Sequence, residues 1–525
     1  MSEARKGMVK IARFFSPYND VLFAIVAVAA VVPLWIPEFP PLVDLPQHAA
    51  QVAALQELLS GNSFHTHDLT INWFTPYLGG YMLLYLASTV LPIVVATKLL
   101  TSLAVIALPV VSGLLFRAMG GDERLKWLAI PAGYSFALYW GFFVYLVAVP
   151  IGLALVYATV AYEQNPTTKR SIGIAALSVA LFFCHAMALG FCALISLTYL
   201  LAKNFRNPMR FIRCSLPYAA PLPIIAIWMS NLIDTDASVR EAPLKLGTLD
   251  EKLAVLFTQF SGLDGASFGT SLALFALTVL LPVLSGYRIS SKPERWLPML
   301  VGLLVYLAFP SNAQNTAYLF HRLAVFLVPL WLVMWDPPQR FRPVVFFAFL
   351  GMLGVWLAVN TNRFIEFAGE SAVFSRVLHK AEPGKRMAGL MVCNGSPGFA
   401  YPVYVHFASW YQAEYRGIAD RSFATAHPSL VRYRDVDAPR VAKRISWRPL
   451  AFAWDRDGGP SYDYFIVCAP ADLSARIFKG HVNSVELVAK DLPWWLYRKR
   501  TEISVATTAA AAAHLQRTGD SEATR

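Results

Sequence analysis

Residues 37–76 read PEFPPLVDLPQHAAQVAALQELLSGNSFHTHDLTINWFTP, a polar stretch between apolar segments that contains no Lys or Arg. Prolines near its start stiffen the backbone around Asp44 and His48, because proline fixes φ. Pro46 suits the first turn of a helix, and a Gly-Asn pair is typical of a helix end, so we predict one short helix over Gln47–Ser60. Asp44 then precedes a helix N-terminus, where unpaired amides favour a carboxylate. We expect Asp44 to be ionised at neutral pH.

The predicted helix separates its apolar from its polar side chains. The two sets are Ala49, Val52, Leu55, Leu58 and Leu59 against Gln47, Gln51, Gln56 and Glu57. This pattern is typical of a helix that lies in a membrane interface. The alternative is an ordinary capped helix on a protein surface.

The composition places the chain among polytopic membrane proteins. Of its 525 residues, 56% are hydrophobic and only 15% are charged. The net charge of +12 is dispersed in short loops between apolar runs, as in membrane topology, so we expect no nucleic-acid partner. The first apolar run, from Val21, follows several basic residues and lacks a small-residue cleavage site. We therefore expect a retained anchor helix with a cytoplasmic N-terminus.

Long apolar runs predict membrane helices, and basic loops mark the cytoplasmic side. We predict about eleven spans: Val21–Ile36, Leu99–Phe116, Trp127–Trp140, Val144–Tyr162, Ser171–His185, Ala186–Leu201, Ser215–Ser230, Phe268–Ser285, Trp296–Pro310, Leu319–Trp335 and Val344–Asn360. An odd number of spans places the C-terminus on the outer face. A polar outer loop, Asn231–Ser267, is expected to contain a surface helix over Leu249–Phe260.

The apolar stretch Tyr77–Phe116 is long enough for two spans. Counting two would place Arg117, Arg124 and Lys126 outside and would invert every later loop. We therefore assign Tyr77–Val95 to the first outer loop, residues 37–95, as a partly embedded hairpin or juxtamembrane helix.

After Asn360 the composition changes to short strand candidates, Ala388–Cys393 and Tyr464–Cys468, between polar loops. We predict a transmembrane domain over residues 1–360, a soluble extracytoplasmic α/β domain over 361–505 and a disordered tail over 506–525. Cys393 and Cys468 could pair if this domain lies outside the cytoplasm, although two scattered cysteines do not establish a disulfide framework.

An acidic residue before a short helix in the first outer loop, followed by a semi-embedded apolar segment, resembles the GT-C superfamily of polytopic glycosyltransferases. The residues that carry the resemblance are Asp44 and His48 in FPPLVDLPQH, the segment TPYLGGYMLLYL and the turn LYWGFFVYL. The likeness covers the architecture of residues 1–360 and is closest to a bacterial branch that also ends in a small extracytoplasmic domain. It implies inverting transfer of a hexose or pentose from a polyprenyl-phosphate carrier. The acceptor would be a glycan, a lipid or a protein of the cell envelope, on the periplasmic face of the inner membrane.

The chain departs from the GT-C pattern in its carboxylates. Many such enzymes carry a second acidic residue in the next outer loop, but Tyr139–Tyr145 contains none. The sequence HTHD, with His65, His67 and Asp68, is a weak metal pattern because it has no further fixed ligand. His65 would join the site only if the loop folded back. We therefore predict no metal and no other cofactor.

Sugar transfer from a lipid phosphate to a hydroxyl requires a base and a cation that holds the phosphate. Asp44 is the candidate base, and its alternative role is to cap the following helix. His48 would orient this carboxylate or the acceptor, or would form an interfacial hydrogen bond. Arg322, with His321 beside it, would bind the carrier phosphate or else extend to lipid headgroups.

Three further residues are candidates for substrate binding. His185 lies where two predicted spans meet, and would either line a cavity or form a hydrogen bond in the turn. Tyr139 and Trp140 are candidates for a sugar platform, with an aromatic belt at the membrane interface as the stronger alternative.

Two other function classes compete with the transferase. A transporter or flippase of lipid-linked saccharides predicts inverted repeats and ionisable residues at mid-membrane depth, and neither is clear in the sequence. A non-catalytic envelope assembly protein would use the soluble domain as a binding module.

Overall fold

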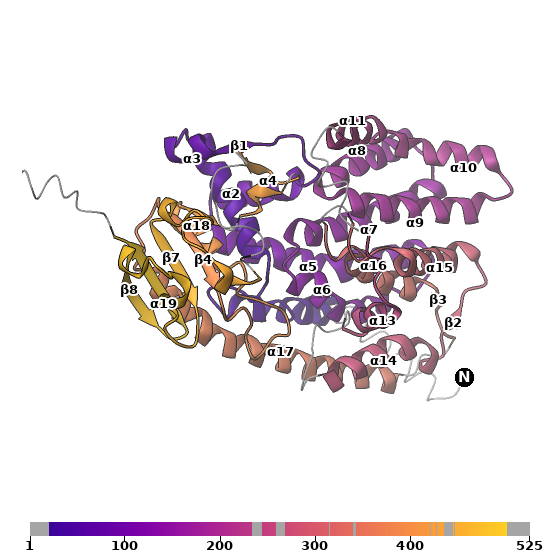
Figure 1. The fold of residues 1–525 in the computed structure, drawn as a ribbon. Helices are drawn as coiled ribbons and strands as arrows, with labels where there is room; N and C mark the ends of the chain where they lie inside the picture. Colours follow the sequence, from indigo (N-terminus) through magenta and orange to yellow (C-terminus); the bar gives the residue numbers. More distant parts are fainter. Residues whose placement is uncertain are drawn as a thin grey trace, which may run out of the picture.

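The computed structural model describes residues 20–233, 244–258, 268–313, 316–339, 343–420, 422–426, 428–434, 445 and 447–500. The protein is mainly helical, with a sheet near its C-terminus (Figure 1). The predicted disordered tail, much of the loop Asn231–Ser267, and Arg340 and Arg342 lie outside the described residues.

The helical part begins with the apolar helix Asp20–Trp35. The α-helices that follow are α2 (Leu45–Leu59), α3 (Ser63–Asp68), α4 (Leu78–Ser88), α5 (Ile93–Ala118), α6 (Phe136–Tyr139), α7 (Phe143–Gln164), α8 (Thr168–Cys184), α9 (Ala186–Asn204), α10 (Pro208–Ser215), α11 (Leu222–Ile233), α13 (Leu249–Thr258), α14 (Phe268–Leu284), α15 (Pro293–Ala308), α16 (Leu319–Val333) and α17 (Pro343–Leu378). Short 3-10 helices include η2 (Glu123–Ala129), η3 (Pro131–Tyr134) and η4 (Leu216–Ala219).

Four of these helices are long and apolar enough to cross a membrane: α5, α7, α9 and α17. A fifth span is obtained if α10 with η4 and α11 is counted as one bent span, with an angle of 48° at its break. Helix Asp20–Trp35, α4, α14 and α16 are apolar but shorter. The predicted helical class is confirmed, whereas the count of eleven spans stays a prediction.

Three predicted segments differ in the structure. The predicted span Trp127–Trp140 is wrong as a continuous helix: it is broken into η2, η3 and α6, because Pro131 cannot donate a backbone hydrogen bond and disfavours helix in the residue before it. Of the two alternatives for Tyr77–Val95, a hairpin or a single helix, the structure has the single helix α4, and α5 already begins at Ile93 rather than Leu99. The predicted surface helix Leu249–Phe260 is α13, which packs on α14 and α16 and buries Lys252.

The helices share a common end, here called the basic end. Gln164 at the end of α7 donates to the carbonyl of Ala118 at the end of α5 (2.7 Å), and Lys203 at the end of α9 pairs with Glu294 at the start of α15 (2.9 Å). The connections at this end hold Arg117, Arg124, Lys126, Lys169, Arg170, Lys203, Arg206, Arg210, Arg213, Arg288, Lys292 and Arg295. In Figure 1 this end, marked by α10 and the short strands β2 (Arg288–Ile289) and β3 (Trp335–Asp336), lies opposite the C-terminal sheet.

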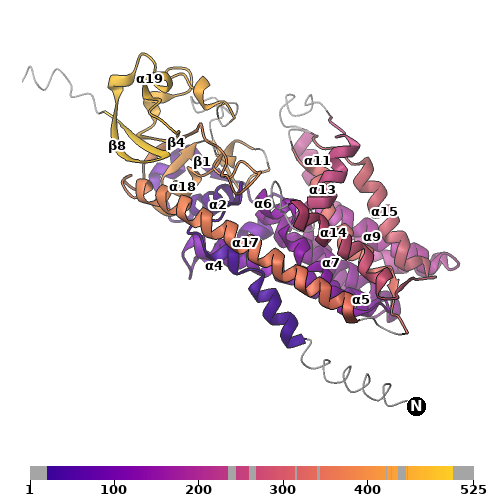
Figure 2. The ribbon, with the colours of Figure 1, turned by 90° about the horizontal axis from the view of Figure 1, so that it is seen from below.

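Helix α17 joins the two parts of the molecule. It runs for 36 residues without interruption from the basic end to the C-terminal sheet (Figure 2). The predicted domain boundary at residue 360 therefore falls inside one continuous helix.

The C-terminal sheet has the strand order β5-β4-β7-β9-β8. Its strands are β4 (Arg386–Met391), β5 (Ile418–Asp420), β7 (Tyr464–Cys468), β8 (Val485–Asp491) and β9 (Trp494–Lys499). Strand β4 is parallel to β5 and β7, whereas β9 is antiparallel to its two neighbours. Both predicted strand candidates are confirmed, as β4 and β7. A disulfide joins Cys393 to Cys468, with 5.3 Å between their Cα atoms.

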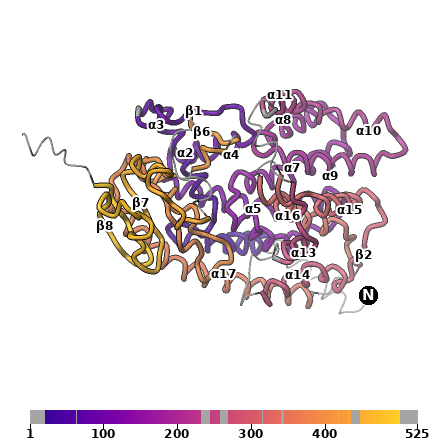
Figure 3. Tube along the Cα trace, in the orientation of Figure 1, coloured from indigo at the N-terminus to yellow at the C-terminus, as the bar shows by residue number. Residues whose placement is uncertain are grey.

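The first loop and the C-terminal region are interlocked. Strand β1 (Leu69–Ile71) of the loop pairs with β6 (Val431–Tyr433), and the two lie together in Figure 3. Helix α18 (Ser409–Tyr415) packs on α2. As a result, every residue of α2 from Leu45 to Leu55 is buried, so the prediction that this helix lies in a membrane interface is wrong.

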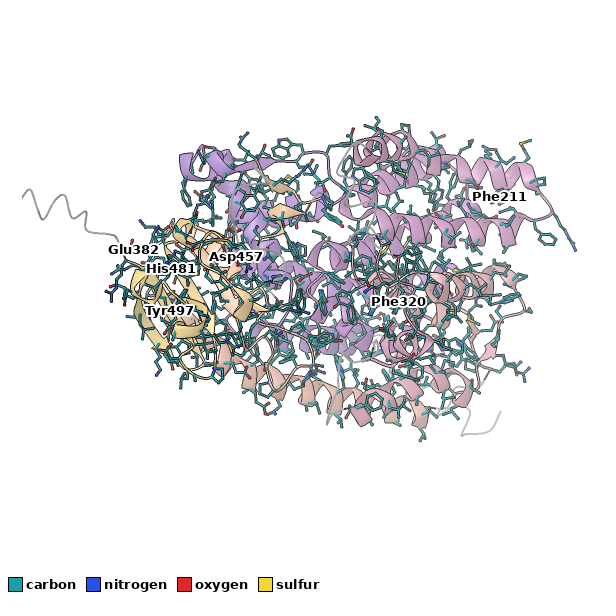
Figure 4. The ribbon with its side chains drawn as sticks, in the orientation of Figure 1. Phe211, Phe320, Glu382, Asp457, His481 and Tyr497 are labelled. Atoms are coloured by element: carbon teal, nitrogen blue, oxygen red, sulfur yellow. A yellow bond between two sulfur atoms is a disulfide. The ribbon has the colours of Figure 1, made fainter. Side chains whose placement is uncertain are left out.

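Figure 4 shows where several side chains lie in the helical part and in the C-terminal region. Phe320 is fully buried in the helical part, where it stacks on His321. Asp457, His481 and Tyr497 lie in the C-terminal region, where Tyr497 packs against Phe478 over the sheet.

Candidate functional site

A cavity of about 610 Å³ lies between the helical part and the C-terminal region. Its lining includes Asp44, His48, His185, Arg322 and His406, which come from four separate segments of the chain, because Asp44 and His48 both lie at the start of α2. The structure thus brings together four residues that the sequence singles out, together with Trp140, on one concave surface.

Asp44 is held by its backbone at the edge of this cavity. It occupies the N-cap position of α2, but its side chain makes no capping hydrogen bond. The amides of Val43 and Asp44 instead donate to the carbonyls of Tyr139 (3.1 Å) and Trp140 (2.9 Å). Among the described residues, His406 Nε2 lies 3.5 Å from Asp44 Oδ1.

Gly141 makes the close approach of these two segments possible. Its φ is +76°, and an added Cβ would lie 2.7 Å from the amide nitrogens of Asp44 and Leu45. A side chain at this position would be strained and would collide with the start of α2. The turn LYWGFFVYL thus supports Asp44 directly.

His48 follows Asp44 by one helical turn and faces the same cavity. Its Nδ1 lies 2.9 Å from the hydroxyl of Tyr81 in α4. Burial, with a smaller effect from the positive Arg322, lowers the pKa of His48 to about 3. His48 is therefore a neutral hydrogen-bonding group at physiological pH.

Arg322 brings a partly buried positive charge to the same cavity. Its Nη1 donates to His185 Nε2 (3.3 Å), its Nη2 donates to the carbonyl of Ala317 (3.4 Å), and its guanidinium lies 3.9 Å from the centre of the Phe142 ring. Its Nε has no hydrogen-bond partner among the described residues. The described residues also place no carboxylate in an ion pair with Arg322, so a bound anion would stabilise this charge.

The start of α16 contributes an aromatic wall. Tyr318, the N-cap residue, has a φ of +60°, which is unusual for a residue other than glycine. Its ring centre lies 4.1 Å from that of Trp140, and both residues line the cavity. Trp140 is buried against Phe136 and Tyr318 rather than forming part of an interfacial belt.

Three predicted site residues are not part of the lining. His321 is buried against Phe320, because adjacent residues of a helix point about 100° apart and Arg322 already faces the cavity. Tyr139 donates to Asn360 Oδ1 (2.7 Å) in α17. His65 lies in α3, beyond the far end of α2, a helix about 22 Å long at 1.5 Å per residue, and its Nε2 lies 3.3 Å from the carbonyl of Gly417.

The HTHD sequence has structural partners. His67 Nδ1 lies 3.0 Å from Asp68 Oδ1, and Asp68 forms an ion pair with Arg386 of β4. Among the residues that the structure describes, no three His, Cys, Asp or Glu side chains gather as a metal-binding group.

Sequence reasoning missed several lining residues, notably His406, Lys245 and Tyr81. Tyr81 lies in the quoted segment TPYLGGYMLLYL, where Gly80 lets α4 pack on α7: an added Cβ would lie 2.9 Å from Val144 Cγ1. The sequence feature that could have indicated the part of the cavity formed by the C-terminal region is the row of glutamines on α2. Two of these bind the C-terminal backbone: Gln47 accepts from the amide of Phe423 (2.8 Å), and Gln51 accepts from the amide of Val431 (2.7 Å).

Fold and site define a class: a mainly helical protein, with several helices long and apolar enough to span a membrane, that encloses a cavity lined by both a carboxylate and a partly buried arginine. No protein-family model matches the chain, and no curated protein matches it in sequence.

Proposed function

We propose that the protein is a GT-C-like glycosyltransferase that transfers a hexose or pentose, with inversion, from a polyprenyl-phosphate carrier to an acceptor hydroxyl of the cell envelope. The single observation that carries this proposal is the cavity whose lining includes both Asp44 and Arg322, from segments distant in the sequence. The resemblance of the first loop and of the turn LYWGFFVYL to GT-C enzymes supports the same function.

In this proposal Asp44 is the general base. Its carboxylate takes the proton of the acceptor hydroxyl as that oxygen forms a bond to C1 of the sugar. The bond between C1 and the phosphate oxygen breaks at the same time, and the electron pair leaves with the phosphate. The carrier phosphate gains one negative charge in this step, so a cation beside it stabilises the transition state more than the ground state.

Arg322 is the proposed phosphate partner. Its charge is partly buried and lies against the face of Phe142, where electrostatic attraction to an anion is stronger than in water. The planar guanidinium can bind two phosphate oxygens, and His185 orients it through Nη1. Neutral His48 and the Trp140–Tyr318 pair are placed to contact the sugar or the acceptor.

We also propose a bacterial inner-membrane location with the cavity and the C-terminal sheet on the periplasmic side and about eleven spans in total. The basic end supports this orientation. Its loops concentrate Lys and Arg, and such loops lie on the cytoplasmic side, opposite the cavity. The Cys393–Cys468 disulfide supports an oxidising compartment for the C-terminal region.

Asp44→Asn tests the base. The full-length protein is reconstituted in liposomes with polyprenyl-phosphate-linked hexoses and pentoses and a crude envelope acceptor fraction, and released polyprenyl phosphate is measured by mass spectrometry. Because general base catalysis contributes about 10²- to 10⁴-fold, we expect turnover to fall by about that factor with expression unchanged. Asp455→Asn, on an exposed carboxylate near His481, is the matched control and should retain full activity.

Arg322→Gln tests the phosphate partner. We expect it to abolish the thermal stabilisation that polyprenyl phosphate gives the wild type, while Arg322→Lys retains part of it because charge remains without the planar geometry. Arg206→Gln, at the basic end, is the control. Full turnover in Asp44→Asn would exclude the proposed base. Movement of labelled carrier across the bilayer without sugar transfer would favour a flippase.

A further inference from the structure

The C-terminal region places one histidine against the proposed base. His406 is buried, with 8% of its surface exposed, and its Nε2 lies 3.5 Å from Asp44 Oδ1. Its ring also meets Phe423 at 5.7 Å in an edge contact. The structure therefore fixes the position of this ring, and the remaining question is which nitrogen carries the proton.

The hydrogen bonds of the neighbouring Gln47 determine which nitrogen of His406 carries the proton. A backbone amide can only donate, so the oxygen of Gln47 must face the amide of Phe423, at 2.8 Å. The NH₂ group of Gln47 is then directed at His406 Nδ1, at 3.3 Å. Since this NH₂ group can only donate, Nδ1 must be the acceptor and carries no proton.

An imidazole whose Nδ1 lacks a proton carries it on Nε2, the nitrogen that faces Asp44. We propose that His406 is a positioning residue for Asp44: Gln47 holds it in the neutral Nε2–H tautomer, in which it donates to the carboxylate and orients it toward the acceptor. This inference rests on the proposed function of Asp44. The 3.5 Å separation fits an unliganded site, because catalytic hydrogen bonds often shorten only when substrate binds.

The arrangement has a chemical advantage for a base. A histidinium at this position would place a full positive charge beside the carboxylate and would lower its basicity. A neutral donor orients the carboxylate with less loss of basicity. The C-terminal region thereby contributes to the site a group that the helical part does not supply.

Nitrogen-15 NMR of histidine-labelled, full-length protein in lipid tests the tautomer directly, with His406 assigned from the signals lost in His406→Gln. We expect an unprotonated Nδ1 and a protonated Nε2 at neutral pH, and a changed Nε2 signal in Asp44→Asn. Gln47→Glu should place a proton on Nδ1, because its carboxylate oxygen would face that nitrogen. A proton on Nδ1 in the wild type, or no response to Asp44→Asn, would overturn the inference.

Kinetics test the positioning role in the liposome assay. His406→Gln keeps an N–H donor, and we expect it to retain most of kcat, whereas His406→Phe and Gln47→Glu should each lower kcat about tenfold or more while KM for the donor stays within about twofold. His481→Gln is the matched control, since His481 lies 3.4 Å from Asp455 in an exposed pair of similar geometry. Equal kcat in wild type and Gln47→Glu would overturn the role.

The NMR and kinetic experiments together distinguish a failure of this inference from a failure of the proposed function. If the wild type consumes no polyprenyl-phosphate sugar, the function fails, and the NMR signals alone decide the tautomer. If His406→Phe does not fold, Gln47→Glu and the NMR response to Asp44→Asn still decide the positioning role.

Discussion

His48 shows how one buried side chain couples the cavity to pH. It shares the cavity with a cation and is enclosed by protein, and both conditions disfavour its protonated form. Its pKa is about 3 in the folded protein, against about 6.5 in an unfolded chain. Between these values the unfolded state binds more protons than the folded state, so acid favours unfolding and stability rises with pH.

This linkage predicts the effect of His48→Gln. In the wild type the free energy of unfolding should fall by about 2 kcal/mol as the pH is lowered from 7 to 5. His48 stays neutral in the folded protein but becomes protonated in the unfolded chain, and each pH unit below the unfolded pKa is worth about 1.4 kcal/mol. Glutamine does not titrate, so the variant should lose less stability on acidification. Thermal unfolding of the liposome-bound protein at pH 7 and pH 5 measures this difference. His67→Gln, on a side chain that is 86% exposed, should keep the wild-type pH dependence, and an unchanged slope in His48→Gln would contradict the prediction.

At the scale of single residues, the sequence could predict which residues are chemically suited to a site better than which way their side chains point. Asp44 was identifiable because it directly precedes a predicted helix, and Arg322 because an arginine in an apolar run is exceptional. The sequence does not show which of two adjacent residues points into the cavity. His321 and Tyr139 were therefore assigned to the site along with Arg322 and Trp140, although only Arg322 and Trp140 line the cavity. His406 could not be predicted, since only the folded chain brings it to Asp44.

At the scale of elements, the turn LYWGFFVYL and the start of α2 form one unit. Two backbone hydrogen bonds join them, and Gly141 lies at their closest approach. The unit fixes the position of Asp44 through backbone groups alone.

Gly141→Ala tests this unit. Alanine at a positive φ costs roughly 1–2 kcal/mol by itself, and here its Cβ would also meet the Asp44 and Leu45 amides at 2.7 Å. We expect a larger loss of thermal stability than this strain alone, with reduced turnover. Gly120→Ala is the matched control: its φ is +78°, but nothing lies within 4 Å of an added Cβ. Equal losses in the two variants, with full turnover, would argue against the unit.

Elements with long apolar runs could be predicted from sequence, and those defined by their partners could not. Helices α7, α9 and α14 begin and end close to the predicted bounds. The segment 127–140 was misassigned because apolar composition outweighed Pro131 in the prediction. The polar face of α2 was wrongly assigned to water. Gln47 and Gln51 instead bind backbone groups of the C-terminal region, and hydropathy cannot distinguish a polar residue that binds backbone from one that faces water.

At the scale of the whole molecule, the chain has two chemically different ends joined by α17. One end carries the basic connections, and the other carries the cavity, the sheet and the disulfide. This polarity predicts an orientation in the membrane, because basic loops are retained in the cytoplasm.

Cysteine labelling in intact bacterial cells tests the orientation. A membrane-impermeant maleimide should label Asp455→Cys, whose parent side chain is 82% exposed, before lysis and should label Arg206→Cys only after lysis. The native Cys184, Cys192 and Cys214 are buried, so the unmodified protein serves as the background. The reverse order of labelling would invert the topology and place the cavity in the cytoplasm.

At this scale the sequence could predict two composition classes, helical and strand-forming, but not their interlocking. The strands of the C-terminal sheet were recognisable from their local pattern. The pairing of β1 with β6 was not, because each is a three-residue strand whose partner lies far away in the sequence.

That pairing also sets the order of events during synthesis. Residues 69–71 must wait for residues 431–433, and at about 5–20 residues per second this separation corresponds to roughly 20–70 s of translation. The loop that carries Asp44 therefore emerges early and remains without its partner strand and without His406 while the intervening helices are inserted. The nascent chain has no finished cavity until the C-terminal residues that line it have been made.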